Sequence, residues 1–299
     1  MKDFNDKVAV ITGGASGLGF ALAKATQARG AKLVLADIRE DALLSAKDDL
    51  AENGEVLTVR TDVSKSKDLE ALAKAAVDHF GKVNLLVNNA GVFASGVSWE
   101  TSEEEYEWVI GVNQRSVFNG IRAFVPRMIA QGDECHVVTI SSGAGITVNP
   151  GFCTYSMTKH AALALTESLY LDLKAQGIET IGVTIAMPGM SQSGIMAPEK
   201  TLDGELKAEV DGRKSNTVLR ALETLMQAGV QAGLPASDLA EIVFAAIEKE
   251  ELYALPAFDD EANRVFSTAV AMGRATATNN YPPFVDAFLE TLKDVARTS

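Results

Sequence analysis

The sequence predicts an α/β protein whose doubly wound parallel sheet has helices on both faces, with a helical flap and a helical C-terminal tail added. Over about the first two hundred residues, short β-branched runs alternate with longer runs of helical period. The run VAVI at 8–11 is apolar throughout, as expected of a strand covered on both faces. A glycine follows each of four predicted helices, where it can adopt the left-handed conformation that closes a helix.

The elements follow in chain order. The first strand, at 8–11, leads through a glycine-rich turn to a helix at 20–29, which Gly30 ends. The same order recurs twice, with strands at 32–37 and 56–60, helices at 41–53 and 69–80, and closing glycines at Gly54 and Gly81. Further strands are predicted at 85–88, 136–140 and 179–186, and long helices at 106–129 and 154–175, the second of them followed by Gly177.

The pattern changes after Pro188. From about 190 to 234, apolar residues recur at helical intervals, charges of both signs are present, and no strand is predicted. A helix at 240–248, a strand at 252–255 and a helical extension at about 257–299 complete the chain. Because no Ser-, Gly- or Pro-rich linker and no internal repeat divides the chain, we expect a single domain over 1–299, with the flap at about 190–234.

Composition limits the partners. The 299 residues hold 27 Lys and Arg against 40 Asp and Glu, a net charge of −13 that repels phosphate backbones and anionic membranes. We therefore expect neither a nucleic acid nor a membrane as partner. The start of the chain lacks the apolar stretch of a signal peptide, and no run approaches the length of a membrane span, which predicts a cytoplasmic protein. Cys135 and Cys153 have no His or Cys neighbours at metal spacing, so we expect two free thiols and no metal site.

The glycine-rich turn is the first motif that indicates chemistry. It reads TGGASGLG at 12–19, and glycines there let the backbone approach a pyrophosphate, whose charge lies against free N–H groups of the following helix. A tight turn without a ligand is the alternative for this loop alone. Asp37 ends the second strand, where a carboxylate can accept hydrogen bonds from an adenosine ribose and repel a 2′-phosphate. It favours NAD, although Arg39 weakens the repulsion and an Asp there can also act as a helix cap.

Tyr155 and Lys159 form the second motif, because positions i and i+4 share one face of a helix and place an ammonium beside a phenol. Lowering the pKa of a phenol from ~10 to ~7 requires about 4 kcal/mol. A nearby cation together with the positive charge of an oxidised nicotinamide could supply it. Ser142, at the end of a predicted strand, could reach a substrate oxygen held by the tyrosine. An amphipathic pair on a partly exposed helix is the alternative for the tyrosine and lysine alone.

In their order and spacing these motifs resemble those of short-chain dehydrogenases/reductases of the YxxxK type, over about residues 7–255. The resemblance rests on TGxxxGxG at 12–19, Asp37, Asp62-Val63, NNAG at 88–91, Asn113, Ser142, Tyr155, Lys159 and Pro188-Gly189. It implies a Rossmann-type sheet and a catalytic set of Asn113, Ser142, Tyr155 and Lys159. It also implies a set of cofactor-binding residues: Gly13, Ser16, Gly17, Leu18, Gly19, Asp37, Asp62, Val63, Asn89, Ala90, Gly91, Tyr155, Lys159, Pro188, Gly189 and Ser193.

The family implies a role for several of these residues. Asp62 and Val63 would hold the adenine, Lys159 would bind the nicotinamide ribose, and Asn113 would hold a water that links Lys159 to solvent. Asn89 and Ala90 would line the cofactor cleft. Ser193 stands five residues after Pro188, where the family usually has a Thr that contacts the carboxamide. Serine also carries a hydroxyl, so the resemblance implies the same kind of contact.

These residues predict an NAD-dependent oxidoreductase that interconverts a secondary alcohol and a ketone by hydride transfer. An NADPH-dependent ketone reductase is the alternative among enzymes, and a non-catalytic NAD(H)-sensing regulator is the alternative of another class. An apolar substrate pocket is predicted from Phe93, Ile146, Val148, Phe152 and Met190. The flap and tail resemble those of family members that act on bulky aromatic alcohols. Apolar residues of the helices at 106–129 and 154–175 predict a homo-oligomer, a dimer or a homotetramer.

Overall fold

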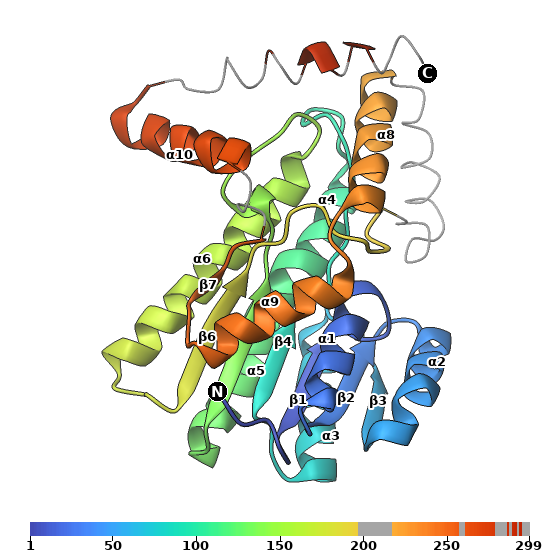
Figure 1. The fold of residues 1–299 in the computed structure, drawn as a ribbon, viewed down its shortest axis with the longest axis vertical. Coiled ribbons are helices and arrows are strands. Elements are labelled where there is room, and N and C mark those ends of the chain that lie inside the picture. Colours follow the sequence, from blue (N-terminus) through green and yellow to red (C-terminus); the bar gives the residue numbers. More distant parts are fainter. Residues whose placement is uncertain (197–216, 257–260, 279–285, 287–288, 292, 295–299) are drawn as a thin grey trace.

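A computed structural model describes residues 1–196, 217–256, 261–278, 286, 289–291, 293 and 294 (Figure 1). Its sheet has seven strands in the order β3-β2-β1-β4-β5-β6-β7, and every neighbouring pair is parallel. Parallel strands joined by helices confirm the predicted doubly wound fold. The predicted flap at 190–234 and the predicted tail lie partly outside the described residues.

The strands are β1 (Val8–Thr12), β2 (Lys32–Asp37), β3 (Val56–Arg60), β4 (Leu85–Asn88), β5 (Cys135–Ile140), β6 (Ile181–Ala186) and β7 (Tyr253–Ala254). The described helices include α1 (Gly17–Ala28), α2 (Glu40–Leu50), α3 (Ser66–Phe80), α4 (Glu103–Ile110), α5 (Ser116–Gln131), α6 (Cys153–Ala175), α8 (Thr217–Ala232), α9 (Ala236–Glu248) and α10 (Glu261–Thr276). After β3 the chain crosses to the other side of β1 and continues outward from β4. The carboxyl ends of β1 and β4 therefore flank a crevice, which is where open α/β sheets bind ligands.

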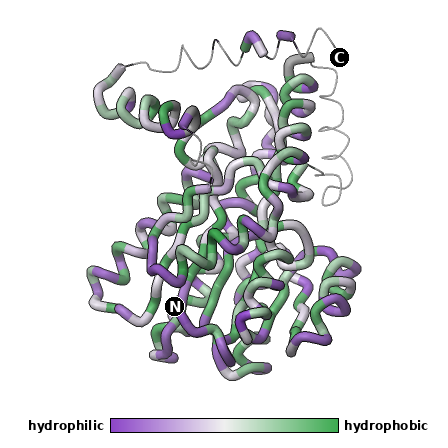
Figure 2. Tube along the Cα trace, in the orientation of Figure 1, coloured by the Kyte–Doolittle hydropathy of each residue, from purple (hydrophilic) through white to green (hydrophobic). Residues whose placement is uncertain are grey.

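Helices cover both faces of the sheet. Residues of α1, α2 and α9 pack on one face, and residues of α3, α5 and α6 pack on the other. Residues of the central strands are fully buried between the two layers, for example Leu33 toward the first layer and Leu86 toward the second. In Figure 2 the central strands are coloured mostly as hydrophobic, in keeping with their burial between the two helix layers. Burial of this apolar surface from water is the main force that stabilises such a sheet.

The chain between 106 and 129 differs from its prediction as one continuous helix. Here α4 and α5 are separated by a π-helical turn at Gly111–Arg115. Within this turn the Asn113 carboxamide accepts a hydrogen bond from the Val92 N–H at 2.8 Å and donates to the Val92 carbonyl at 2.9 Å. A wider turn brings this side chain to the end of β4, and π-helical turns of this kind frequently occur at functional sites.

Two helices stand above the carboxyl edge of the strands (Figure 1). One is α8. The two ends of the predicted flap are hydrogen-bonded to each other: the Leu234 N–H donates to the Met190 carbonyl at 3.1 Å, and the Gln192 N–H donates to the Leu234 carbonyl at 2.9 Å. The other is α10, in the described part of the C-terminal extension. None of the described helices is both long and apolar enough to cross a lipid bilayer. As predicted, Cys135 and Cys153 are free thiols, the first buried and the second exposed.

Candidate active site

A cavity of about 690 Å³ opens at the carboxyl edge of the sheet, and the glycine-rich loop after β1 forms one wall of it. Gly13 and Gly17 have φ angles of +61° and +53°, in the left-handed region that favours glycine. A Cβ atom at Gly19 would lie 2.0 Å from the carbonyl oxygen of Gly13, so no larger residue fits there. The loop therefore approaches itself closely and leads into α1 at Gly17, and the first N–H groups of a helix have no acceptor within the helix itself.

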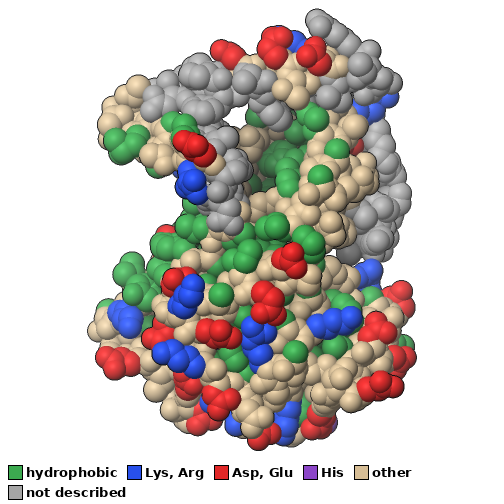
Figure 3. All heavy atoms as spheres, in the orientation of Figure 1, with side chains coloured by type: hydrophobic (Ala, Val, Ile, Leu, Met, Phe, Trp, Pro, Cys, Tyr) green, Lys and Arg blue, Asp and Glu red, His purple; other side chains and the backbone are tan. Residues whose placement is uncertain are grey.

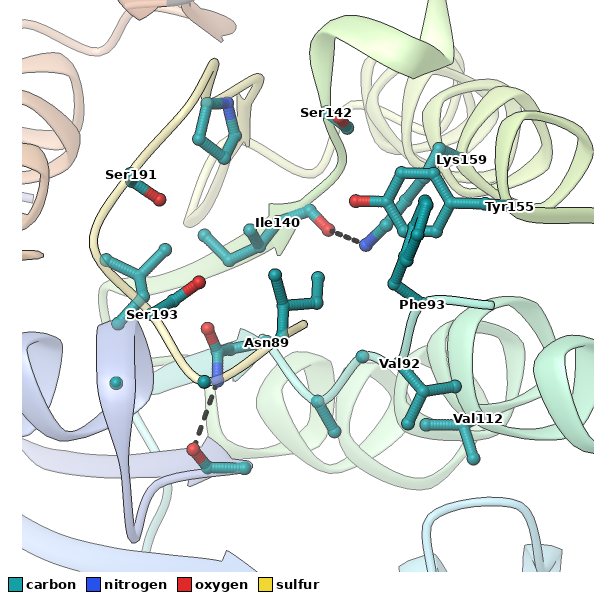
Figure 4. A pocket seen from close by; sticks show the side chains of 18 of the residues that line it. Asn89, Val92, Phe93, Val112, Ile140, Ser142, Tyr155, Lys159, Ser191 and Ser193 are labelled. Carbon is teal, nitrogen blue, oxygen red and sulfur yellow. Dashed lines mark hydrogen bonds between the residues drawn. The ribbon is translucent and has the colours of Figure 1, made fainter. Parts of the chain in front are cut away.

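The end of β4 is fastened to this loop through Thr12 and Asn89. The Thr12 hydroxyl accepts hydrogen bonds from the N–H groups of Asn89 at 3.0 Å and Ala90 at 3.2 Å. In return, Asn89 Nδ2 donates to the carbonyls of Thr12 at 2.8 Å and Gly13 at 3.2 Å. Figure 4 shows Asn89 at the wall of the cavity with one of these bonds as a dashed line. These four residues, from the segments that follow β1 and β4, are thus held in one unit, which fixes the width of the crevice.

Asp37 lies at the end of β2, lines the cavity and is only 8% exposed. Its carboxylate accepts a hydrogen bond from the Arg39 N–H at 3.1 Å and lies 3.7 Å from Arg39 Nε. Arg39 Nη2 also donates to the Ser16 hydroxyl of the glycine-rich loop at 2.9 Å. The carboxylate and a guanidinium therefore share this end of the cavity.

Asp62 follows β3 and, with Val63, lines the same end of the cavity. Burial acts to raise the pKa of Asp62, but hydrogen bonds from Lys65 and Ser64 outweigh it, so the pKa falls below its usual value. Lys65 Nζ lies 2.7 Å from one carboxylate oxygen, and the Ser64 hydroxyl donates to the other at 2.6 Å. The side chain is therefore ionised and held in place at neutral pH.

Ser142, Tyr155 and Lys159 meet where β5 ends and α6 begins (Figure 4). Tyr155 and Lys159 are one helical turn apart, and Lys159 Nζ lies 5.6 Å from the centroid of the Tyr155 ring. Lys159 Nζ donates a hydrogen bond to the Ile140 carbonyl at 3.0 Å. The Ser142 hydroxyl accepts one from the Ala144 N–H at 3.1 Å. The three side chains predicted to act together are therefore brought together.

Burial dominates the electrostatics of this group. It raises the pKa of Tyr155, and a hydrogen bond with Ser142 offsets part of that rise. Burial also lowers the pKa of Lys159 to about 8. The expected lowering of the tyrosine pKa by Lys159 is therefore not found: burial raises this pKa, and the group that acts against the rise is Ser142. A phenolate at neutral pH would need a further positive charge beside Tyr155.

Asn113 is the one predicted site residue that does not line the cavity. It is buried, and besides its two bonds to Val92 its Nδ2 donates to the Thr158 hydroxyl at 3.2 Å. Thr158 in turn donates to the Tyr155 carbonyl at 2.8 Å. Asn113 thus reaches the tyrosine through Thr158, a link that the sequence analysis missed and that the position of Thr158 within the YxxxK motif could have indicated.

All the other predicted site residues line the cavity: Gly13, Ser16, Gly17, Leu18, Gly19, Asp37, Asp62, Val63, Asn89, Ala90, Gly91, Ser142, Tyr155, Lys159, Pro188, Gly189 and Ser193. Of the predicted pocket residues, Phe93, Phe152 and Met190 line it. Ile146 and Val148 are not among the lining residues, and Val148 is 41% exposed because its turn points to solvent. Further lining residues that the sequence did not predict are Trp108, Thr147, Asn149, Met226, Val230 and Ser267.

The cavity has an apolar end, which we define by Phe93, Phe152, Met196 and Met226. The ring of Phe93 meets those of Phe152 and Tyr155 edge to face, each at a centroid distance of 5.1 Å. Of the described residues that line the cavity, the charged ones are Asp37, Arg39, Asp62 and Lys159. No cluster of three or more metal-ligating side chains occurs in the part of the chain that the structure describes. The apolar end of the cavity therefore suits an uncharged molecule, whose reacting group would lie at Tyr155.

Comparison with known families identifies the class of protein. Residues 7–202 match the family model for short chain dehydrogenases, which covers more than half of the chain and includes the glycine-rich loop, Tyr155 and Lys159. The chain belongs to the short-chain dehydrogenase family. It is thus an oxidoreductase of this family, as the motifs predict.

Individual short-chain dehydrogenases are similar over nearly the whole chain. One solved structure, of a short chain dehydrogenase/reductase from Burkholderia phymatum in complex with NAD, is 37% identical and has a TM-score of 0.85, with 94% of this chain and 98% of that chain covered. A C alpha-dehydrogenase from a Sphingobium species is 37% identical over 86% of this chain and 82% of its own. A CLA biosynthesis dehydrogenase/reductase from Lactiplantibacillus plantarum is 30% identical over 89% of this chain and 95% of its own.

Proposed function

We propose that the protein is an NAD-dependent oxidoreductase that interconverts a secondary alcohol and a ketone, with an apolar and bulky or aromatic substrate. The observation that carries this proposal is that Ser142, Tyr155 and Lys159 share one cavity with the glycine-rich loop and Asp37. The apolar end beside Tyr155 supports a substrate without charge.

The residues that line the cavity fit a nicotinamide dinucleotide. The close approach of Gly13 to Gly19 leaves room for a pyrophosphate and no room for side chains. Asp37 would accept hydrogen bonds from the adenosine ribose, Asp62 and Val63 would hold the adenine, and Ser193 would contact the carboxamide. When bound, the oxidised nicotinamide accepts a hydride from the carbinol carbon of the substrate.

The remaining chemistry belongs to the side chains of the chain. Tyr155 would remove the hydroxyl proton during oxidation and return it during reduction, while the Ser142 hydroxyl would stabilise the developing oxyanion. The Lys159 ammonium would favour the phenolate and hold the nicotinamide ribose. Asn113 would position a water that carries protons from Lys159 to solvent. Because burial raises the pKa of Tyr155, we expect the phenolate to form only once the positive nicotinamide is beside it.

Asp37 supports NAD as the cofactor, since a dianionic 2′-phosphate beside a carboxylate loses a hydrogen bond and gains repulsion. The Burkholderia relative was crystallised with NAD. Arg39 favours a second candidate function, an NADPH-dependent ketone reductase, because its guanidinium bridges Asp37 and Ser16 at the place where that phosphate would lie.

A panel of secondary alcohols and ketones, followed by NADH absorbance, tests the proposal. We expect reduction of NAD by at least one alcohol, and a value of kcat/KM about a hundredfold higher with NAD than with NADP, if the discrimination is worth about 3 kcal/mol. Equal efficiency with both cofactors would support the NADPH reductase instead. NADH binding without reaction of any alcohol or ketone would contradict the proposed reaction and favour the alternative of a non-catalytic NAD(H)-sensing regulator.

A further inference from the structure

Two polar side chains that line the cavity have no role in the proposed mechanism. One is Asn149, in the turn before α6, whose carbonyl accepts a hydrogen bond from the Phe152 N–H at 3.2 Å. The other is Ser267, on α10. Within the described residues, neither the Asn149 carboxamide nor the Ser267 hydroxyl has a hydrogen-bond partner. By contrast, the neighbouring Thr147 hydroxyl donates to the Gly143 carbonyl at 3.2 Å.

The packing of α10 explains why Ser267 faces the cavity. Arg274 Nη1 donates to the carbonyl of Ile146 at 3.1 Å, which fastens α10 to the same turn that carries Asn149. Ser267, Val270 and Arg274 are spaced i, i+3 and i+7 and so share one face of the helix, and Val270 is only 1% exposed. Val265 and Met272 lie on the opposite face and are 53% and 54% exposed.

The surroundings of these two side chains are apolar. Figure 3 shows hydrophobic side chains gathered beneath and between α10 and α8. Among the described lining residues the cations are Arg39, which reaches Ser16, and Lys159, which donates to Ile140. A carboxylate or phosphate at the apolar end would therefore lose its hydration without gaining a cation from the described lining residues. A neutral oxygen group would instead gain a donor and an acceptor that are already in place.

We propose that Asn149 and Ser267 form a polar subsite that binds an uncharged oxygen substituent of the substrate, a hydroxyl, ether or carbonyl remote from the reacting carbon. This assignment depends on the proposed function, which places the reacting carbon of the substrate beside Tyr155. Asn149 offers an amide donor and a carbonyl acceptor, and Ser267 offers a hydroxyl that does both. One neutral hydrogen bond discriminates by about tenfold, and α10 is thereby a determinant of specificity as well as a wall of the cavity.

The test compares 1-phenylpropan-1-ol with its derivatives that carry a hydroxyl or methoxy group at ring position 3 or 4. In the wild-type protein we expect at least one derivative to have a kcat/KM about tenfold above that of the parent. Asn149→Ala and Ser267→Ala should each move this ratio toward one. Thr268→Ala, on the exposed side of the same helix, is the matched control and should leave the ratio unchanged. A ratio that neither active-site variant alters, or no preference in the wild type, would overturn the subsite.

Calorimetric titration of the same alcohols into the protein, with and without saturating NAD, separates this proposal from the proposed function. If the wild-type protein oxidises none of the alcohols, the proposed function fails, and the ratio of dissociation constants still decides the subsite. The subsite is supported if an oxygenated derivative has a dissociation constant about tenfold below that of the parent and loses this advantage in Asn149→Ala and Ser267→Ala. Equal dissociation constants for parent and derivatives in all proteins contradict it.

Discussion

Tyr155 and Lys159 are both buried, and for each side chain burial opposes the charged form. For the phenol the charged form is the phenolate, so its pKa rises; for the amine it is the ammonium, so its pKa falls to about 8. The same burial strengthens any interaction between charges here, because the effective dielectric constant is low. A site of this kind responds strongly to a cation that arrives with a ligand.

Replacement of Tyr155 by Phe removes the proposed proton acceptor and little else. We expect Tyr155→Phe to lower turnover by about three orders of magnitude, the upper part of the range for general acid–base catalysis. NADH binding, followed by fluorescence, should stay within about twofold, since in the proposed function Tyr155 is one of many residues that would contact the cofactor and its ring is kept. Tyr170→Phe, further along α6, is the matched control. A Tyr155→Phe protein with a tenth of the wild-type activity would show that another group carries the proton.

Lys159 gives a pH-dependent prediction with a defined sign. Its pKa is about 8 in the folded chain against an ordinary value of 10.5, so between these values the unfolded chain binds a proton that the folded chain does not. The buried ammonium therefore destabilises the fold fully below pH ~8, and the effect disappears as the pH rises toward ~10.5. Lys159→Met should raise the free energy of unfolding at pH 7 by about 2 kcal/mol, less than the full shift because the Ile140 carbonyl loses its donor.

Urea unfolding of the NAD-free protein at pH 7 and pH 10 measures this effect. The stabilisation by Lys159→Met should shrink at pH 10, while turnover and NADH binding of the variant fall at all pH values, because in the proposed function the Lys159 side chain would also bind the nicotinamide ribose. Lys47→Met, an exposed lysine on α2, should change neither quantity. Equal free energies of unfolding for wild type and Lys159→Met at pH 7 would mean that burial of the charged amine does not destabilise the fold.

At the scale of whole elements, the sequence predicted those parts of the fold that depend on local pattern. The runs that form β1 and β2 are apolar enough to be identified from the sequence, and the glycines between 12 and 19 indicate a closely packed turn between the first strand and the first helix. The π-helical turn at Gly111–Arg115 was missed because it depends on bonds from Asn113 to Val92, 21 positions earlier. The place of α10 was missed for the same reason, since Arg274 contacts Ile146 across 128 positions.

The position of α8 depends on one polar contact and one close apolar contact. The Ser95 hydroxyl donates to the Glu223 carboxylate at 2.6 Å, across 128 positions of the sequence. Leu222 packs so closely against Gly151 that a Cβ atom there would lie 2.4 Å from the leucine side chain. With Leu219, these contacts place α8 over Phe93, Phe152 and Tyr155, where a lid over the substrate would lie.

We expect hydrogen exchange in α8 to slow when cofactor and substrate bind, because closing elements belong to the least stable parts of a fold. Ser95→Ala should speed exchange in α8 of the ligand-free protein about fivefold to tenfold, the loss of one charge-assisted hydrogen bond. Ser237→Ala, whose hydroxyl bonds only the neighbouring exposed Asp238, is the matched control. Because α8 is the described part of the predicted flap, equal protection of α8 with and without ligands would contradict the prediction that the flap closes over the substrate.

At the scale of the whole molecule, three neighbouring helices expose large apolar side chains. Those with at least a third of their surface exposed on α4, α5 and α6 are Tyr106, Phe118, Ile129, Met157 and Leu171, at 41%, 45%, 42%, 36% and 62%. Scattered apolar side chains are normal on a monomer, but several on adjacent helices are typical of an interface between subunits. The net charge of −13 opposes association in general, so any stable assembly must bury enough of this surface to outweigh it.

We therefore expect the protein to assemble through α5 and α6 as a dimer or a homotetramer, with light scattering giving two or four times the chain mass of 31.7 kDa. Phe118→Glu and Leu171→Glu each place a charge where the interface would exclude water, so each should shift the mass toward that of one chain. Leu44→Glu, at a 57% exposed leucine of α2 on another part of the surface, should leave the mass unchanged. A wild-type mass near 31.7 kDa at all working concentrations would rule the assembly out, and a loss of mass in Leu44→Glu as well would move the interface to the face that carries α2.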